Sequence, residues 1–216
     1  MPYHITQRGT NRQRVFFSDG DRSLYLRLIR ERQDAAEVSV LSYCLMSNHV
    51  HLVVVPERLD SLACLFGYVN GRYAQALNIR KGRSGHLWQA RYFSCVMSEQ
   101  HLWVGLRYVE ENPCRAGLAP TPQEYPWSSA AVHLLGVRDR RRVLDLDFWR
   151  RAGGVDTWQE MFRADDMVDR VTELRKCTYS GRPFGDEAFV TSMEERFGRK
   201  WRRSHVDPVQ SIAISA

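Results

Sequence analysis

Hydrophobic residues in the first 136 positions follow two patterns, one typical of strands and one typical of helices. Short runs of β-branched and aromatic residues predict strands, and apolar positions three or four residues apart predict amphipathic helices. The predicted strands cover residues 3–8, 14–17, 38–46, 49–55 and 87–97, and the predicted helices lie within residues 19–29, 60–77 and 98–112. We expect the first two strands to form a hairpin. The order predicts an α+β fold, a small antiparallel or mixed sheet with helices on one face.

Individual residues predict where the helices begin and end. Asp19 or Asp21 is expected to cap the first helix and Asp60 the second, because a carboxylate accepts hydrogen bonds from the free backbone N–H groups of a first turn. The third helix is expected to end near Asn112, because Pro113 disfavours helical geometry in the residue before it.

Beyond residue 127 the pattern changes to helical segments separated by charge runs. The run RDRRR at residues 138–142 is expected to mark a boundary. We therefore predict one domain over residues 1–136 and a helical, locally basic C-terminal extension over residues 137–216. Residues 196–203 are the densest basic cluster, and they either follow a nucleic-acid backbone or form a basic end in solvent.

Composition adds weaker constraints. The 216 residues are 44% hydrophobic and 26% charged, which is ordinary for a folded domain. No apolar run approaches the ~18 residues of a membrane span, and the first residues do not form an apolar signal segment, so we expect a cytoplasmic protein without a membrane partner. The five cysteines show no CxxC spacing and are expected to be reduced thiols. A net charge of +6 and a pI near 9.2 suit a polyanionic partner.

His49 and His51 are the first candidate metal ligands. In a strand, side chains at i and i+2 leave the same face while Val50 points into the core on the other. The two residues rise by roughly 7 Å, so both imidazoles can reach one ion. An isolated HxH pair is weak evidence, because two surface histidines on an exposed strand give the same pattern.

Tyr108 and Asn112 lie four residues apart on the predicted third helix and therefore share a face. Tyrosine is a competent nucleophile toward phosphorus once a nearby cation favours the phenolate. The amide oxygen of Asn112 can complete a His-His-amide ligand set. A core tyrosine and a C-capping asparagine would explain the same two residues.

Several stretches together resemble a known family. They are MSNHVHLVV at residues 46–54, GHLWQARY at 85–92 and RYVEENPCRAGL at 107–118, with YHITQRG at 3–9 and YPWSS at 125–129. In order and spacing they resemble the signatures of single-tyrosine HUH transposases, specifically the REP-associated tyrosine transposases. The resemblance covers residues 3–130 closely and the tail more loosely, through SGRPFG at 180–185.

The resemblance implies a role for each candidate residue. His49 and His51 match the paired metal histidines, and Tyr108 matches the nucleophile. Asn112 stands where related insertion-sequence transposases often use glutamine, which implies a third metal ligand. Residues 1–136 would form the catalytic domain, with a ferredoxin-like antiparallel sheet that agrees with the strand and helix order above.

The resemblance also implies a reaction: cleavage and rejoining of single-stranded DNA next to short palindromic hairpins of the REP type. The metal, Mg²⁺ or Mn²⁺, would polarise the scissile phosphate, although imidazoles also accept zinc or nickel. Tyrosine attack would form a 5′-phosphotyrosine and a free 3′-hydroxyl. The REP-associated branch is expected to act as a monomer, whereas related insertion-sequence enzymes are often dimers.

DNA contacts are expected from polar and basic side chains near these motifs, which could bind phosphates or splayed bases. The candidates are Arg8, Asn11, Arg12, Arg72, Arg80, Lys81 and Arg83. Ordinary solvated surface charge explains each of them equally well.

Three other functions share some of these features. A replication initiator or relaxase uses the same chemistry, but the short chain and the Tyr-x-x-x-Asn-Pro context disfavour it. A DNA-binding protein that retains the fold without nicking would not need His49, His51 and Tyr108 together. A metallophosphatase would leave Tyr108 without a role.

Overall fold

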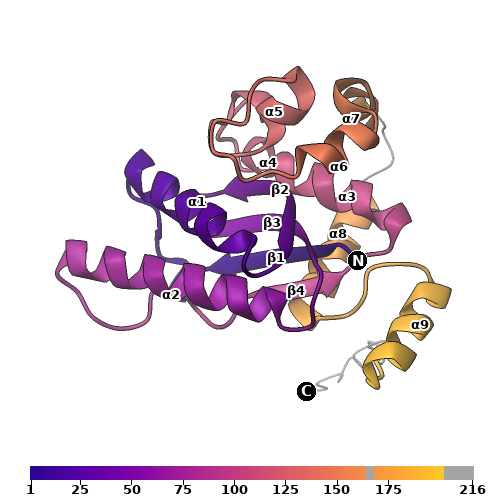
Figure 1. The fold of residues 1–216 in the computed structure, drawn as a ribbon, viewed down its shortest axis with the longest axis horizontal. Coiled ribbons are helices and arrows are strands. Elements are labelled where there is room, and N and C mark those ends of the chain that lie inside the picture. Colours follow the sequence, from indigo (N-terminus) through magenta and orange to yellow (C-terminus); the bar gives the residue numbers. More distant parts are fainter. Residues whose placement is uncertain (164–167, 202–216) are drawn as a thin grey trace, which may run out of the picture.

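Four strands form one antiparallel sheet in the computed structural model, which describes residues 1–163 and 168–201 (Figure 1). The strands are β1 (Tyr3–Arg8), β2 (Val38–Leu45), β3 (His49–Pro56) and β4 (Phe93–Val96), in the spatial order β2-β3-β1-β4. Helix α1 (Asp19–Gln33) connects β1 to β2, and α2 (Ser61–Lys81) connects β3 to β4. This order of strands and helices is ferredoxin-like, so the predicted α+β fold class is confirmed.

The two faces of the sheet are covered by different helices. Helices α1 and α2 pack side by side (Figure 1). The rings of Tyr25 and Tyr73 meet between them, with centroids 5.3 Å apart. Helices α3 (Glu99–Glu110) and α8 (Val168–Ser180) contact each other and the sheet. Helices α1 and α2 form the predicted ferredoxin-like layer. Helices α3 and α8 form a second layer on the opposite face of the sheet, to which alternate strand residues point.

Helix α1 is capped by a residue other than the two predicted. Ser18 is the N-cap, and its hydroxyl accepts a hydrogen bond from the Asp21 backbone N–H. The Asp21 carboxylate in turn accepts from the N–H groups of Phe17 and Ser18, at 2.7 and 3.0 Å. Asp21 is therefore the N3 residue of a capping box, and Asp19 lies at N1. The prediction was wrong because Ser18, one residue earlier, satisfies the same N–H groups.

Helix α2 does begin after Asp60, as predicted, but the Asp60 side chain does not cap it. Its carboxylate pairs instead with Arg58, at 3.1 Å. The end of α3 agrees with the expectation from Pro113: the helix stops at Glu110, and a separate short helix, α4 (Asn112–Arg115), carries Pro113 in its first turn.

Two predicted strands were wrong in part or in whole. Residues 14–17 are not a strand, because β3 and β4 occupy both edges of β1; the N–H groups of Val15 and Phe16 bond instead to the Ser47 carbonyl. The predicted strand over residues 87–97 is regular only in β4. Residues 87–92 leave the regular ladder and stay beside the end of β1 through the isolated Gly9–Trp88 bridge and the hydrogen bond from the Gln89 N–H to the Arg8 carbonyl.

The C-terminal part is mainly helical in the described residues, as predicted. Besides α4, the chain beyond α3 forms η2 (Pro122–Glu124), α5 (Ala130–Leu135), α6 (Leu146–Arg151), α7 (Gly154–Arg163), α8 and α9 (Glu187–Phe197), and η1 (Thr10–Arg12) follows β1. Residues 202 and 203 of the basic cluster lie outside the described part. Among the described helices, none is long and apolar enough to cross a membrane.

Candidate active site

His49 and His51 leave β3 on the face that α3 and α8 cover. Val50 between them is fully buried on the opposite face, as strand alternation requires. The two imidazole rings lie 4.9 Å apart between centroids. Across the β1–β3 ladder, Arg8 stands opposite His49 and Thr6 opposite His51. The two histidines therefore share one face, next to an arginine.

Tyr108 reaches the same place from α3. The helix lies close to the sheet because Gly105, one turn before Tyr108, has no side chain: a Cβ atom there would lie 2.6 Å from Met97 Sδ. The Tyr108 ring packs edge-on against His51, with centroids 5.3 Å apart, and its side chain is 6% exposed. The structure thus brings together the two histidines and the tyrosine singled out in the sequence.

The hydrogen bonds of His49 determine which of its nitrogens is free. Asn48 Nδ2 donates to the Arg12 carbonyl at 3.1 Å, which turns Asn48 Oδ1 toward His49. His49 Nδ1 lies 2.6 Å from that oxygen and must donate, because an amide oxygen only accepts. A neutral His49 therefore presents the lone pair of Nε2, the atom a metal ion takes.

His51 is held by a second buried histidine. His4 Nε2 lies 3.0 Å from His51 Nδ1, and His4 Nδ1 lies 2.7 Å from Thr178 Oγ1 on α8. The His4 and His51 rings are nearly parallel, with centroids 5.2 Å apart. The Nδ1 atom of His51 is thus engaged, and its Nε2 atom is the one left for a ligand.

Burial sets the protonation states of these groups. It lowers the pKa of His49 to about 4, helped by Arg8 and Arg175, and that of His51 well below its ordinary value, helped by His49 and His4. Both imidazoles are therefore neutral and able to bind a metal at neutral pH. Burial raises the pKa of Tyr108, opposed by Arg115 and Arg175. Tyr108 is therefore a neutral phenol beside cationic groups.

Asn112 is buried and lies four residues after Tyr108, and its side chain is oriented by hydrogen bonds to the backbone. Its Nδ2 donates to the Tyr108 carbonyl at 2.9 Å. In the described part of the chain Asn112 forms no hydrogen bond to either histidine, and no three His, Cys, Asp or Glu side chains there lie close enough to hold a metal. Two neutral imidazoles with free Nε2 atoms still fit a divalent metal, and an amide oxygen is a suitable third donor.

A basic pocket of about 540 Å³ lies next to His49. Its lining residues are Arg8, Asn11, Arg12, Gln89, Phe93, Arg175 and Tyr179. Three of these side chains, Gln89, Phe93 and Tyr179, also line a larger groove of about 1230 Å³ that passes between α2 and β4. The groove carries Trp88 and Tyr92, which pack partly against the core. Pocket and groove together form a continuous depression with cationic and aromatic walls.

The seven expected DNA contacts divide into two groups. Arg8, Asn11 and Arg12 line the basic pocket. The other four have partners on or near α2: Arg72 lies over the Tyr68 ring, Arg80 pairs with Asp21, Lys81 lies over the Phe17 ring, and Arg83 bonds to Asn78 and Gln13.

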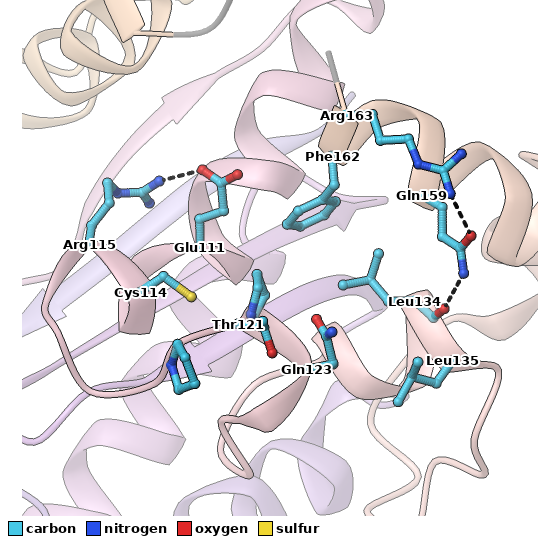
Figure 2. Close-up of a pocket in the computed structure, with 12 residues that line it drawn as sticks. Glu111, Cys114, Arg115, Thr121, Gln123, Leu134, Leu135, Gln159, Phe162 and Arg163 are labelled. Atoms are coloured by element: carbon cyan, nitrogen blue, oxygen red, sulfur yellow. Dashed lines mark hydrogen bonds and ion pairs between the residues drawn. The ribbon is translucent and has the colours of Figure 1, made fainter. Parts of the chain in front are cut away.

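A separate hollow of about 550 Å³ lies beyond the end of α3 (Figure 2). Figure 2 shows the Arg115 and Glu111 side chains joined at its edge, where they form an ion pair at 2.9 Å. On the other side, Gln159 donates to the Leu134 carbonyl at 3.1 Å. The hollow contains neither histidine of the pair nor Tyr108.

Four residues of the site were not found from the sequence. Asn48 and His4 had a local signal, since Asn48 adjoins the pair and strand alternation puts His4 on one face with Arg8. Arg175 and Thr178 had none, because no local pattern determines where α8 docks.

Comparisons with known proteins identify the family of this chain and a solved structure with a similar fold. The family model "Transposase IS200 like" matches residues 1–112. A REP-associated tyrosine transposase bound to a REP hairpin has a similar fold, with a TM-score of 0.53, 15% identity, and coverage of 62% of this chain and 79% of that one. A protein described as a candidate transposase from Deinococcus radiodurans R1 gives a TM-score of 0.39 at 21% identity, covering 51% and 89%. No curated protein sequence matches significantly. The family match spans more than half of the chain, which therefore belongs to the IS200-like transposase family.

Proposed function

We propose that this transposase cleaves and rejoins single-stranded DNA through Tyr108, in a metal-dependent reaction next to short hairpins of the REP type. The observation that carries the proposal is the position of the Tyr108 ring, 5.3 Å from the His51 ring. Burial raises the pKa of Tyr108, and the charges of Arg115, Arg175 and Arg8 oppose that rise. A nucleophile, a metal-binding pair and phosphate-binding cations thus converge on one place.

The cleavage step is a transesterification at phosphorus. The Tyr108 oxygen forms a bond to the scissile phosphorus, and the bond from phosphorus to the 3′ oxygen breaks. The phenol loses its proton and the leaving 3′ oxygen gains one, so charge and atoms balance. A 3′-hydroxyl can later attack the 5′-phosphotyrosine in the reverse sense, which rejoins strands without a nucleotide cofactor.

His49, His51 and the amide oxygen of Asn112 would hold the metal, Mg²⁺ or Mn²⁺. When bound, the ion supplies Lewis acidity at the phosphate and favours the phenolate form of the nucleophile. The arginines of the basic pocket bind the phosphate and orient it toward Tyr108. The edge-on packing of Tyr108 against His4 and His51 holds the phenol in place before DNA arrives.

The continuous depression beside His49 is the proposed path of the single strand. Its arginines suit phosphates and its aromatic side chains suit stacked bases. The solved REP-associated transposase with a similar fold is bound to a REP hairpin, which supports a hairpin as the double-stranded part of the substrate. We assign catalysis to residues 1–136, with Arg175 supplied by the extension over 137–216, and expect the chain to act as a monomer.

The test uses a labelled single-stranded hairpin from DNA that flanks the gene. After incubation with Mn²⁺, a denaturing gel should show a covalent protein–DNA band that requires the metal and is lost in Tyr108→Phe. Tyr179→Phe is the matched control, because Tyr179 also lines the basic pocket and is 43% exposed. This variant should retain the band.

Two results would overturn the proposal in different ways. Loss of the band in Tyr179→Phe but not in Tyr108→Phe would move the nucleophile to α8. Retarded but uncut DNA, with no covalent band for any metal or flanking hairpin, would instead indicate a DNA-binding protein that has lost nicking activity.

A further inference from the structure

We propose that Thr178 of α8 and His4 of β1 form a hydrogen-bond relay that sets the tautomer of His51. Its direction leaves the lone pair of His51 Nε2 facing the metal site. His4 and Thr178 are positioning residues, because they act through His51. The inference rests on the proposed function only in treating His51 as a metal ligand.

The donor and acceptor roles in the relay are fixed by the Leu174 carbonyl oxygen, which can only accept a hydrogen bond. Thr178 Oγ1 lies 2.8 Å from the Leu174 carbonyl oxygen, one turn earlier on α8, so the threonine hydroxyl donates there. Its oxygen then accepts from His4 Nδ1, 2.7 Å away. The Cys95 thiol, 3.3 Å from the same oxygen, is able to donate to its remaining lone pair.

The positions of the protons on His4 and His51 follow because neither ring is charged. His4 and His51 are 1% and 3% exposed, and in the described part of the chain no carboxylate pairs with either ring. A protonated ring here would be a buried charge without a partner, which is costly. A neutral His4 that donates from Nδ1 accepts at Nε2, so His51 Nδ1 donates across the 3.0 Å contact. His51 Nε2 is then unprotonated.

His49 reaches the same tautomer through an independent partner. Its Nδ1 donates to Asn48 Oδ1, which belongs to the loop between β2 and β3. The two proposed metal ligands are therefore oriented by separate hydrogen bonds. His49 uses its neighbour Asn48, and His51 depends on the contact between His4 and Thr178, which are 174 positions apart in the chain. Partners of this kind hold ring orientation and ligand basicity at metal sites, and their loss typically lowers metal affinity by about 10- to 100-fold.

The primary test is imidazole ¹⁵N NMR of the metal-free full-length protein, without DNA. In the unaltered chain, His51 should be protonated at Nδ1 and not at Nε2. Protonation of His51 at Nε2 would overturn the relay, and no variant is needed for that result. Since neither metal nor DNA is present, the outcome does not depend on cleavage activity.

Variants of Thr178 test the consequence for the metal. Thr178→Val has the same shape but cannot accept from His4, so the His51 tautomer should change and Mn²⁺ affinity should fall by about 10- to 100-fold. Thr178→Ser retains the hydroxyl and should stay near the wild-type affinity. His49 is the internal control, because its tautomer depends on Asn48 and should be unchanged in Thr178→Val.

The outcomes separate the relay from the proposed function. An unchanged His51 tautomer and Mn²⁺ affinity in Thr178→Val would overturn the relay even if the protein cleaves DNA. The expected tautomer in a protein that binds Mn²⁺ but forms no covalent DNA adduct would support the relay and reject the proposed reaction.

Discussion

Replacing Gly105 with alanine tests how closely α3 lies on the sheet. An added Cβ would lie 2.6 Å from Met97 Sδ and 3.0 Å from its Cε, and 3.7 Å from Val53 Cγ2. Ordinary contact needs about 3.5–4.0 Å, so α3 or the Met97 side chain must move by about 1 Å. Overpacking of this kind costs about 1–3 kcal/mol.

The matched control is Gly71→Ala in the middle of α2. An added Cβ at Gly71 meets no atom within 4 Å. Both substitutions gain about 1 kcal/mol from helix propensity, so this contribution cancels in the comparison. Gly105→Ala should therefore be about 1–3 kcal/mol less stable to unfolding than Gly71→Ala. In a chain of this size, each kcal/mol corresponds to a difference of about 2–4 °C in Tm.

Calorimetry or denaturant unfolding measures this difference. Equal stability of the two variants would refute the close approach of α3. Met97→Val removes the two atoms that clash, so in the double variant the penalty at Gly105 should shrink. Because Tyr108 lies one turn from Gly105, the same displacement should slow covalent adduct formation by up to about 100-fold.

Three further predictions concern charged groups. Burial raises the pKa of Asp21, but hydrogen bonds from backbone N–H groups and Arg80 outweigh it, so the folded pKa is below the ordinary 3.8. The stability that its carboxylate contributes is therefore present above pH 3.8 and lost as the pH falls through the folded pKa. Asp21→Asn should therefore destabilise the protein at pH 7, and denaturant curves should converge with the wild type in acid. Glu110→Ala leaves the buried His133 Nδ1 without its partner and should lower the free energy of unfolding by about 2–5 kcal/mol. Glu110→Gln keeps an acceptor oxygen and should lower it less. Equal losses in the two variants would show that this hydrogen bond is unimportant. Arg175→Ala should reduce the slope of log DNA affinity against log salt concentration by about 0.7, and an unchanged slope would place the phosphate elsewhere.

Features with a local sequence pattern were predicted well. Alternation around Val50 was enough to place His49 and His51 on one face, and Pro113 was enough to predict where α3 ends. Tyr108 needed the family resemblance, since a tyrosine on an amphipathic helix is usually part of the core. The resemblance to the family was confirmed by the match over residues 1–112. The roles of the individual site residues stay predictions.

Features that depend on packing over long distances were not predicted. Trp88 and Tyr92 alternate as in a strand, yet of residues 87–97 only those of β4 pair regularly with β1. Thr178 contacts His4 only because α8 docks on the sheet, and helix propensity carries no information on docking. The second helical layer escaped prediction for the same reason.

The docking of α8 also determines when the proposed active site can form during synthesis. Strand β1 emerges from the ribosome before β3 and β4, and it needs both of them, up to Val96, to gain its two neighbours. Its buried His4 finds Thr178 only after more than eighty further residues have been added. Nascent chains fold as their segments become available, so an incomplete chain lacks Arg175 and the contact that holds His51. If the proposed site carries out the proposed cleavage, it is thus kept incomplete until α8 has been translated.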